Sequence, residues 1–239
     1  MFPRLSALLL LGTALAAFGA TPPNTLTDAE KASGWELLFD GTSTQGWHVI
    51  GQSTPGTPGW AAADGELQLR KPEGKTKTLG KDIVTDRDFS DFDLKWEWKI
   101  SQAGNSGLKY NLPEKTKGVG CEYQMIDDQG HPDGKVKGGT HSTASLYDLI
   151  APAPEAKAKP VGEWNESRVL VQGNHVTQWL NGAKSVEFEF GSEELKKLIA
   201  TSKFKDTKGW GVKTSSPILL QDHGDEVSVR NMKIKSGAK

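Results

Sequence analysis

The sequence predicts an all-β protein in which two antiparallel sheets pack against each other. Residues 92–100 alternate apolar and charged side chains, which is the period of a strand with one buried face. Asp64-Gly65 and Asn181-Gly182 each separate two strand-like runs, and such dipeptides suit the tight turns of β-hairpins. Many short strands joined by turns of this kind are typical of a β-sandwich.

The expected strands are spread over the chain from residue 60 onwards. They lie at Trp60–Ala63, Glu66–Arg70, Phe92–Ile100, Cys121–Ile126, Ser145–Ile150, Arg168–Gln172, His175–Leu180, Ala183–Phe190 and Pro217–Gln221. One short helix is predicted after Ser192, a residue that can cap it, with Glu193 and Glu194 in the first turn. The remaining sequence is expected to form turns and loops.

The last strand shows a change of parity. Val227 and Val229 alternate correctly, but the next apolar pair is Met232 and Ile234. A β-bulge at Arg230-Asn231 would restore the apolar face and redirect those two polar side chains.

Composition narrows the classes of partner. The chain has 239 residues, of which 36% are hydrophobic, so it can form a packed core. Its net charge is -1, with no basic stripe, and nucleic acid is therefore not an expected partner. The single cysteine, Cys121, excludes an intrachain disulfide and is expected to be a small buried side chain.

Residues 1–20 have the pattern of a secretory signal peptide. Arg4 precedes an apolar run that ends in small residues, and cleavage after either Ala16 or Ala20 fits. The expected organisation is therefore a signal peptide at 1–20, a polar lead-in at 21–33 and one β-sandwich domain at 34–236. The protein is predicted to be exported to the periplasm or the extracellular space, with no membrane span after signal cleavage.

Six segments in register carry a resemblance to a known family. They read GWELLFDGTSTQGWHV, DFDLKWEWKIS with GNSGLKY, GCEYQMIDD, ASLYDLIAP, GEWNESRVLVQGNHVTQWLNG and PILLQDHGDEVSVRNMKIK. They resemble the 3-keto-disaccharide hydrolase family, also described as 3-keto-glucoside 1,2-lyase/3-keto-2-hydroxy-glucal hydratase domains. The resemblance spans about residues 34–236 and implies a concanavalin A-like jelly-roll fold that acts on sugars oxidised at C3.

Chemistry on such a sugar needs a base, cationic or hydrogen-bonding groups and an acid. A ketone at C3 acidifies the hydrogen on C2, and loss of that proton allows the group on C1 to leave before water adds. Glu122 is predicted to be the base, and Lys109 a donor to the enolate oxygen. His223 is the candidate acid or base because imidazole titrates near neutrality. Arg230, redirected by the expected bulge, is the candidate fixed cation.

A second set of polar and aromatic residues is predicted to contact the sugar. Glu122 and Gln124 share one strand face by period two, and aromatic rings suit the C–H faces of sugars. The candidate binding residues are Gln124, Asn105, Tyr147, Trp164, Asn165, Gln221 and Asp127. Ordinary roles in turns, cores or solvated strand faces remain the alternatives, above all for Asp127, which suits a turn.

Two other functions stay open from the sequence. The sandwich could be a non-catalytic, lectin-like module of a secreted glycan-scavenging system, or a conventional glycosidase with paired carboxylates. No cofactor and no metal ligand are predicted, and the sequence leaves dependence on a divalent cation open. A small carbohydrate is the expected partner, and the oligomeric state is not predicted.

Overall fold

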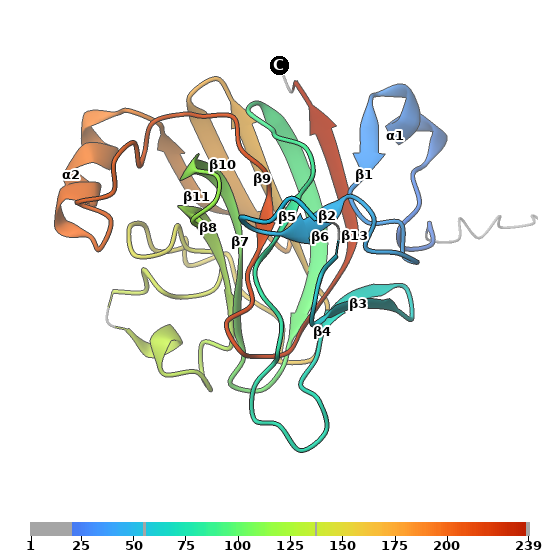
Figure 1. The fold of residues 1–239 in the computed structure, drawn as a ribbon. Helices are drawn as coiled ribbons and strands as arrows, with labels where there is room; N and C mark the ends of the chain where they lie inside the picture. The colour runs from blue at the N-terminus through green and yellow to red at the C-terminus, as the bar shows by residue number, and fades with distance from the viewer. Residues whose placement is uncertain (1–20, 55, 137, 238–239) are drawn as a thin grey trace, which may run out of the picture.

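Two antiparallel β-sheets make up the body of the protein (Figure 1). The computed structural model describes residues 21–54, 56–136 and 138–237, so the predicted signal peptide lies outside the described residues. The described strands are β1 (Trp35–Leu37), β2 (Trp47–Val49), β3 (Trp60–Ala63), β4 (Glu66–Leu69), β5 (Ile83–Thr85), β6 (Phe92–Ile100), β7 (Asn105–Glu114), β8 (Val119–Ile126), β9 (Asn165–Gln172), β10 (His175–Leu180), β11 (Ala183–Glu189), β12 (Leu219–Leu220) and β13 (Val227–Ser236).

The strand order defines a larger and a smaller sheet. The larger sheet runs β11-β10-β9-β6-β13-β4-β3, with β1 added along β13. The smaller sheet runs β2-β5-β12-β7-β8. Since neighbours in each sheet come from distant parts of the chain, the arrangement is a jelly-roll sandwich, and the predicted fold class is confirmed.

The core lies between the sheets and is rich in aromatic side chains. Trp96 of β6 packs edge to face on Tyr123 of β8, with ring centroids 4.9 Å apart. Both side chains are almost fully buried, as are Phe92 and Tyr110. Cys121 also lies in this core, where burial raises the pKa of its thiol, so the expectation of a small buried side chain is confirmed. The alternation along β6 and β8 therefore sends every second side chain outward.

The hairpins and the capped helix form as predicted. The Asp64-Gly65 turn joins β3 to β4, and Asn181-Gly182 joins β10 to β11. Asp64 and Asn181 have φ of 54° and 48°, the left-handed conformation that these turns require. Helix α2 (Glu193–Thr201) begins after Ser192, whose hydroxyl accepts a hydrogen bond from the Leu195 amide.

Two local expectations were wrong. Ser145–Ile150 is not a strand; it folds back on itself, and the Leu146 and Ile150 backbones bond each other. The described chain also holds a second α-helix, α1 (Asp28–Ala32), inside the predicted lead-in. Thr27 and Glu30 form a capping box there, a local signal for a helix start that can act over a very short segment.

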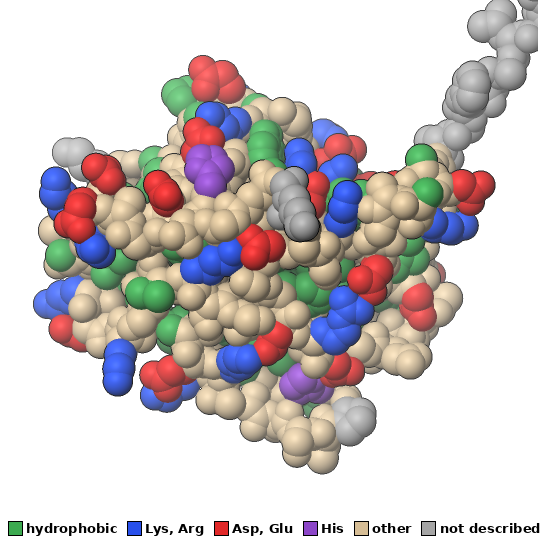
Figure 2. All heavy atoms as spheres, turned by 90° about the horizontal axis from the view of Figure 1, so that it is seen from above, with side chains coloured by type: hydrophobic (Ala, Val, Ile, Leu, Met, Phe, Trp, Pro, Cys, Tyr) green, Lys and Arg blue, Asp and Glu red, His purple; other side chains and the backbone are tan. Residues whose placement is uncertain are grey.

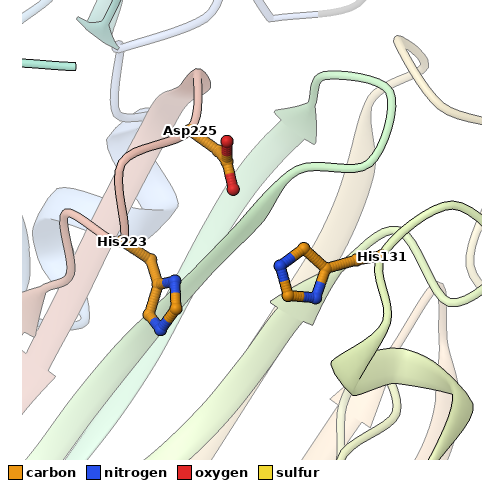
Figure 3. A group of neighbouring side chains, drawn as sticks. All are labelled: His131, His223 and Asp225. Atoms are coloured by element: carbon orange, nitrogen blue, oxygen red, sulfur yellow. The ribbon is translucent and has the colours of Figure 1, made fainter. Parts of the chain in front are cut away.

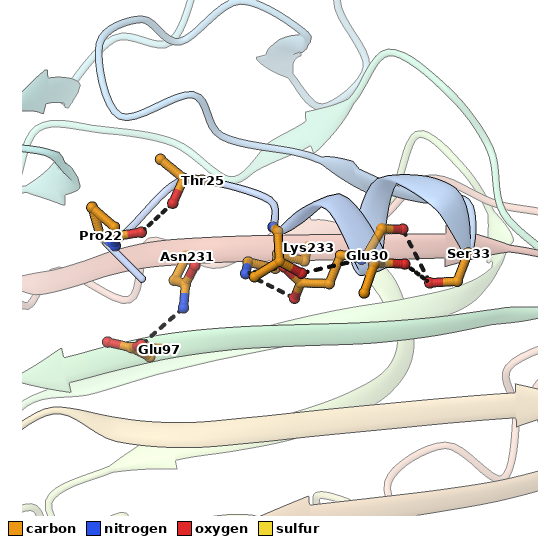
Figure 4. A network of polar contacts seen from close by, with 9 residues as sticks. Pro22, Thr25, Glu30, Ser33, Glu97, Asn231 and Lys233 are labelled. Carbon is orange, nitrogen blue, oxygen red and sulfur yellow. Dashed lines mark hydrogen bonds and ion pairs between the residues drawn. The ribbon is translucent and has the colours of Figure 1, made fainter. Parts of the chain in front are cut away.

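The lead-in packs against the outer face of the larger sheet (Figure 4). The Lys233 Nζ of β13 lies 2.9 Å from Oε1 of Glu30, and the Asn231 amide donates to Asn24 Oδ1 at 2.7 Å. These contacts fix residues 24–33 on the sandwich. Within the described ranges, no helix has the length and apolarity needed to cross a membrane.

The surface mixes charges of both signs. On the face seen from above in Figure 2, basic and acidic side chains are interspersed, without a broad area of one sign on that face. Several exposed charges of the protein are paired, such as Arg87 with Glu36 and Lys184 with Glu187.

Candidate active site on the outer face of the smaller sheet

A row of polar side chains crosses the smaller sheet on the face that points away from the core. Tyr110 of β7 and Tyr123 of β8 point inward, so their neighbours in sequence point outward. The row takes one residue from each of four adjacent strands or strand ends, β5, β12, β7 and β8, and consists of Asp82, Gln221, Lys109 and Glu122.

Lys109 and Glu122 form the centre of this row. They are opposite each other in the β7–β8 register, and Lys109 Nζ lies 3.4 Å from Glu122 Oε2. Only 9% of Lys109 and 6% of Glu122 is exposed. Lys109 also donates to the Gly118 carbonyl at 3.2 Å. A buried ion pair of this kind needs further hydrogen bonds to offset its lost hydration.

Gln221 supplies further hydrogen bonds to both members of the ion pair. With its amide oriented to satisfy both neighbours, its nitrogen donates to Glu122 Oε1 at 3.3 Å and its oxygen accepts from Lys109 Nζ at 3.1 Å. The backbone of Gln221 is fixed as well, since its amide donates to the Gly107 carbonyl and its carbonyl accepts from the Ser106 hydroxyl. Three predicted site residues therefore form one hydrogen-bonded group.

Gly107 makes room for the Glu122 carboxylate. A Cβ at this position would lie 2.6 Å from Glu122 Oε1 and 3.1 Å from its Cγ. Real side chains do not approach so closely, so any larger residue would displace the carboxylate. The glycine is required here by the close approach of a neighbouring strand's side chain.

Gln124 and Asn105 extend the same face. Gln124 is opposite Gly107, and Asn105 begins β7 with the parity of Lys109. Both are buried, and the oxygens Gln124 Oε1 and Asn105 Oδ1 have no hydrogen-bond partner among the described residues. Buried acceptors without partners are uncommon in folded proteins, and a bound polar group would supply the missing donors.

Tyr147 and Lys203 border the Glu122 carboxylate. The amide of Tyr147 donates to the Glu122 carbonyl at 3.0 Å, and Lys203 Nζ lies 4.0 Å from the centre of the Tyr147 ring. Desolvation lowers the pKa of Lys203, and the positive charge of Lys109 acts in the same direction, while Glu122 opposes it. Lys203 therefore places a second ammonium group near the buried pair.

His141 joins the loops that carry these two residues. Its Nδ1 lies 2.7 Å from Asp133 Oδ1 and its Nε2 lies 3.0 Å from Asp148 Oδ1. Asp133 also accepts from the Tyr147 hydroxyl at 2.9 Å, and Asp148 accepts from the Lys203 amide at 2.8 Å. Burial alone would lower the pKa of His141, but the hydrogen bonds to Asp148 and Asp133 raise it overall.

The other end of the row meets the loop that carries His223. Burial raises the pKa of Asp82, and the charge of Asp222 adds to this, while Lys109 and His223 act in the opposite direction. Asp82 accepts a hydrogen bond from the Asp222 amide at 2.9 Å. His223 is exposed, and its charge acts on Asp82, so it lies beside this end of the row.

His223 also belongs to a group that could hold a metal ion (Figure 3). His131, His223 and Asp225 each place a potential ligand atom within 4.8 Å of those of the other two. His131 comes from the loop after β8, and the other two come from the loop before β13. Two imidazoles and one carboxylate suit a divalent transition metal.

The expectation that Arg230 shares a pocket with Glu122 is wrong. The predicted bulge is present, since the β13–β6 register shifts between Arg230 and Lys233. It keeps Met232 in the core and directs Arg230 to the outer face of the larger sheet, where Nε donates to Glu97 Oε2 at 2.7 Å. Arg230 and Glu122 therefore lie on opposite outer faces of the sandwich.

Asn165 begins β9 of the larger sheet, and Trp164 directly precedes it. Arg230 and Lys99 both approach the Trp164 ring, at 4.0 Å and 4.5 Å from its centre. Asn165 Oδ1 accepts from the Lys159 amide and from the Asn181 side chain. These contacts give both residues a structural explanation away from Glu122, so we do not include them in the candidate site.

Asp127 is a turn residue. Its carboxylate accepts hydrogen bonds from the amides of Ala103, Gln129 and Gly130. Burial would raise the pKa of Asp127, but these backbone donors lower it. The alternative interpretation given for Asp127 from the sequence is thus the one that its contacts support.

Sequence reasoning missed Lys203, Asp82 and His141. Each lies in or beside a loop, outside the strand periodicity that identified Glu122. Lys203 follows the helix α2, whose apolar face gives no sign that the next loop returns to the smaller sheet. His141 has no local sequence signal either, because its carboxylate partners Asp133 and Asp148 are eight and seven residues away along the chain.

The fold and the site define a jelly-roll protein with one buried, charged face on its smaller sheet. A family model described as a 3-keto-alpha-glucoside-1,2-lyase-like domain matches residues 34–235. The chain belongs to this family.

Individual relatives agree with that assignment. The chain is 31% identical over 231 residues to a protein of Bacteroides thetaiotaomicron named 3-keto-disaccharide hydrolase, covering 85% of this chain and 79% of the relative. A crystal structure of a putative glycosyl hydrolase from Parabacteroides distasonis superposes with a TM-score of 0.79 and 34% identity, covering 91% and 100% of the two chains. A second such structure from the same organism, at 22% identity and a TM-score of 0.63 over 84% and 98% of the two chains, shares the fold.

Proposed function

We propose that this protein hydrolyses 3-keto-glucosides, including 3-keto-disaccharides, by elimination followed by hydration. The family supports this assignment, as does the name of the Bacteroides thetaiotaomicron relative. The structural observation that carries the proposal is the buried group formed by Glu122, Lys109 and Gln221. It combines a carboxylate, a cation and an amide on one face.

Glu122 is the proposed base. The C3 ketone of the substrate acidifies the C2 hydrogen, and the carboxylate takes that proton while the electron pair moves towards the keto oxygen. The Gln221 amide holds the carboxylate in position through a hydrogen bond, and the absence of a side chain at Gly107 leaves room for it there. A fixed carboxylate needs little reorganisation when it accepts the proton.

Lys109 and Lys203 are the proposed partners of the negative charge that develops on the substrate. Both ammonium groups are close enough to Glu122 to interact with its charge. As Glu122 becomes neutral on accepting the proton, the positive charges beside it can stabilise the enolate oxygen instead. Gln124 and Asn105 supply amide groups for sugar hydroxyls, and the ring of Tyr147 offers a surface for the sugar C–H groups.

The enolate then expels the group on C1. The C1–O bond breaks, a C1–C2 double bond forms, and the leaving oxygen takes a proton, which we assign to His223. Water subsequently adds across the double bond, with its hydroxyl on C1 and a proton returned to C2. The sum is hydrolysis of the glycosidic bond with the ketone retained.

A chromogenic pair of substrates tests the proposal. We expect release of p-nitrophenol from p-nitrophenyl 3-keto-glucoside and none from the parent p-nitrophenyl glucoside, since only the ketone acidifies C2. In D₂O, the 3-keto-glucose product should carry deuterium at C2. Cleavage of both substrates without deuterium at C2 would indicate a conventional glycosidase, and sugar binding without any turnover would indicate a lectin-like module.

Export of the protein is part of the same proposal. The pattern of residues 1–20 supports a signal peptide, and a 3-keto-disaccharide hydrolase in the periplasm or outside the cell would meet its sugars there. Fractionation of cells that express the tagged chain tests this, and recovery of the unprocessed chain in the cytoplasm would contradict it.

A further inference from the structure

Two loops bring together three side chains of the types that bind metal ions, beside the polar row of the smaller sheet. His131 follows β8, while His223 and Asp225 precede β13, so the three converge from segments about ninety residues apart (Figure 3). Their nearest ligand atoms all lie within 4.8 Å of one another. His131 and Asp225 are partly buried and His223 is exposed, which leaves the group open to solvent.

We infer that His131, His223 and Asp225 bind one divalent transition-metal ion. Atoms at these separations need to move inward by only a small amount to reach ordinary metal–ligand distances of about 2.0 to 2.2 Å. Two imidazole nitrogens with one carboxylate oxygen favour Zn²⁺ or Co²⁺ over Mg²⁺ and Ca²⁺, which prefer all-oxygen sites. Three protein ligands leave further coordination positions for water or substrate.

The neighbours of Asp225 hold it in place and also compete for it. Lys71 Nζ lies 3.3 Å from Asp225 Oδ1, which leaves Oδ2 for a metal ion. The ammonium group repels a second cation, so it lowers the affinity of the site. Removal of the Lys71 charge should therefore strengthen metal binding. If Asp225 only paired with Lys71 and bound no metal, this substitution would not change metal affinity.

A hydrogen bond to His131 also lowers the metal affinity of the site. The Asp133 amide donates to His131 Nδ1 at 3.1 Å, which places the ring proton on Nε2 when the ring is neutral. Binding through Nε2 requires that proton to move to Nδ1, and the Asp133 hydrogen bond is then lost. A typical hydrogen bond of this kind changes affinity by about threefold to tenfold, which weakens the site without abolishing it.

The surrounding charge favours a cation. Asp222 precedes His223 directly, and the Asp222 amide donates a hydrogen bond to Asp82. The carboxylates of Asp222 and Asp82 thus lie near the three ligands in addition to Asp225, against the ammonium groups of Lys109 and Lys71. A divalent ion beside them would be attracted by this excess of negative charge.

The site deepens the proposed function, and the role of the ion there rests on that function. A divalent ion at the end of the row would act as a Lewis acid towards a sugar oxygen. A nitrogen of His223 that binds metal cannot donate a proton, so metal binding and the proposed proton transfer need different nitrogens of the ring. His131→Ala separates them because it removes a ligand and leaves His223 intact.

Calorimetric titration of the chelator-treated protein with ZnCl₂ and CoCl₂, without substrate, tests the inference. We expect one ion per chain, at least tenfold weaker binding in His131→Ala and in Asp225→Asn, and tighter binding in Lys71→Met. His48→Ala, at a histidine that pairs with Asp86 elsewhere on the surface, is the matched control and should bind as the parent does. Thermal unfolding of each variant establishes that it is folded.

Two outcomes overturn the inference. Either the parent protein binds neither ion, or His131→Ala and Asp225→Asn bind as tightly as the parent. Because these titrations contain no sugar, they test metal binding separately from the proposed hydrolysis. A protein that cleaves 3-keto-glucosides but binds no ion would keep the proposed function and rule out this metal site.

Discussion

Lys109 and Glu122 face each other across β7 and β8, with Nζ 3.4 Å from Oε2 on the outer face of the smaller sheet. The pair is almost fully covered, although it lies on the side of the sheet away from the core. Gln221, which directly follows β12 on the other side of β7, forms hydrogen bonds with both members. Burial of opposite charges is costly in itself, so their retention at one place in the fold fits a functional role.

Glu122→Gln should abolish most of the activity. The amide has the same shape but cannot accept the C2 proton, so kcat for a 3-keto-glucoside should fall about 10²-fold to 10⁴-fold. Loss of the negative charge beside Lys109 should also lower the free energy of unfolding by about 1 to 3 kcal/mol. Initial rates and urea unfolding measure the two effects.

Glu97→Gln is the matched control for that change. Glu97 is a paired carboxylate on the outer face of the larger sheet, where it binds Arg230. Its removal should cost stability without changing kcat. A kcat within about threefold of the parent in Glu122→Gln would refute the assignment of the base. Removal of a general base typically lowers the rate at least about 10²-fold.

Gly107→Ala should destabilise the protein through Glu122. The new methyl group would lie 2.6 Å from Oε1, and relief of such overlap in a packed site costs about 1 to 3 kcal/mol. In a Glu122→Ala background the overlapping atoms are gone, so the same substitution should cost much less. Urea unfolding of the four proteins gives this coupling, and equal costs in both backgrounds would show that Gly107 has another role.

The strands were predictable where their periodicity is long or their turns are distinctive. The nine alternating residues of β6 and the Asn181-Gly182 turn each specify one local structure. The strand predicted at Ser145–Ile150 was wrong because a short apolar segment has the pattern of a strand. In the structure the chain reverses between Leu146 and Ile150. The five-residue α1 is too short for a periodic signal, and only its capping box marks it.

The candidate site was partly predictable for the same reason. Period two placed Glu122 and Gln124 on one face, but periodicity cannot say which sheet a strand joins. Arg230 was redirected by a bulge, as expected, yet β13 belongs to the opposite sheet, so the redirection led away from Glu122. Lys203 reaches the site through tertiary packing of a loop, for which a single sequence carries no local signal.

Arg230→Ala should leave catalysis intact. Arg230 bonds Glu97 and packs on Trp164, and loss of these partly exposed contacts should lower the free energy of unfolding by about 1 kcal/mol. The kcat on a 3-keto-glucoside should stay within about twofold of the parent. Lys203→Met, which removes a charge near Glu122, should instead lower kcat. A large loss of kcat in Arg230→Ala would indicate that the active site lies on the larger sheet instead.

The stability contributed by His141 should depend on pH. Hydrogen bonds to Asp148 and Asp133 raise the pKa of His141 in the folded protein above its ordinary value of 6.5. A raised pKa means that the folded state binds the proton more tightly than the unfolded state. The stabilisation is therefore complete below the ordinary pKa and is lost as the pH rises through the folded pKa.

His141→Gln should accordingly cost more at about pH 6 than at about pH 9. At the lower pH the parent protein has an imidazolium between two carboxylates, and its removal should cost about 1 to 3 kcal/mol. As the pH rises through the folded pKa the ring loses its proton in the folded state too, so the difference between parent and variant shrinks. Tyr147→Phe removes another hydrogen bond to Asp133 but keeps the imidazole, so its cost should vary much less between the two conditions. Urea unfolding at both pH values measures these differences, and a cost for His141→Gln that rises with pH would mean that His141 is held neutral between Asp133 and Asp148.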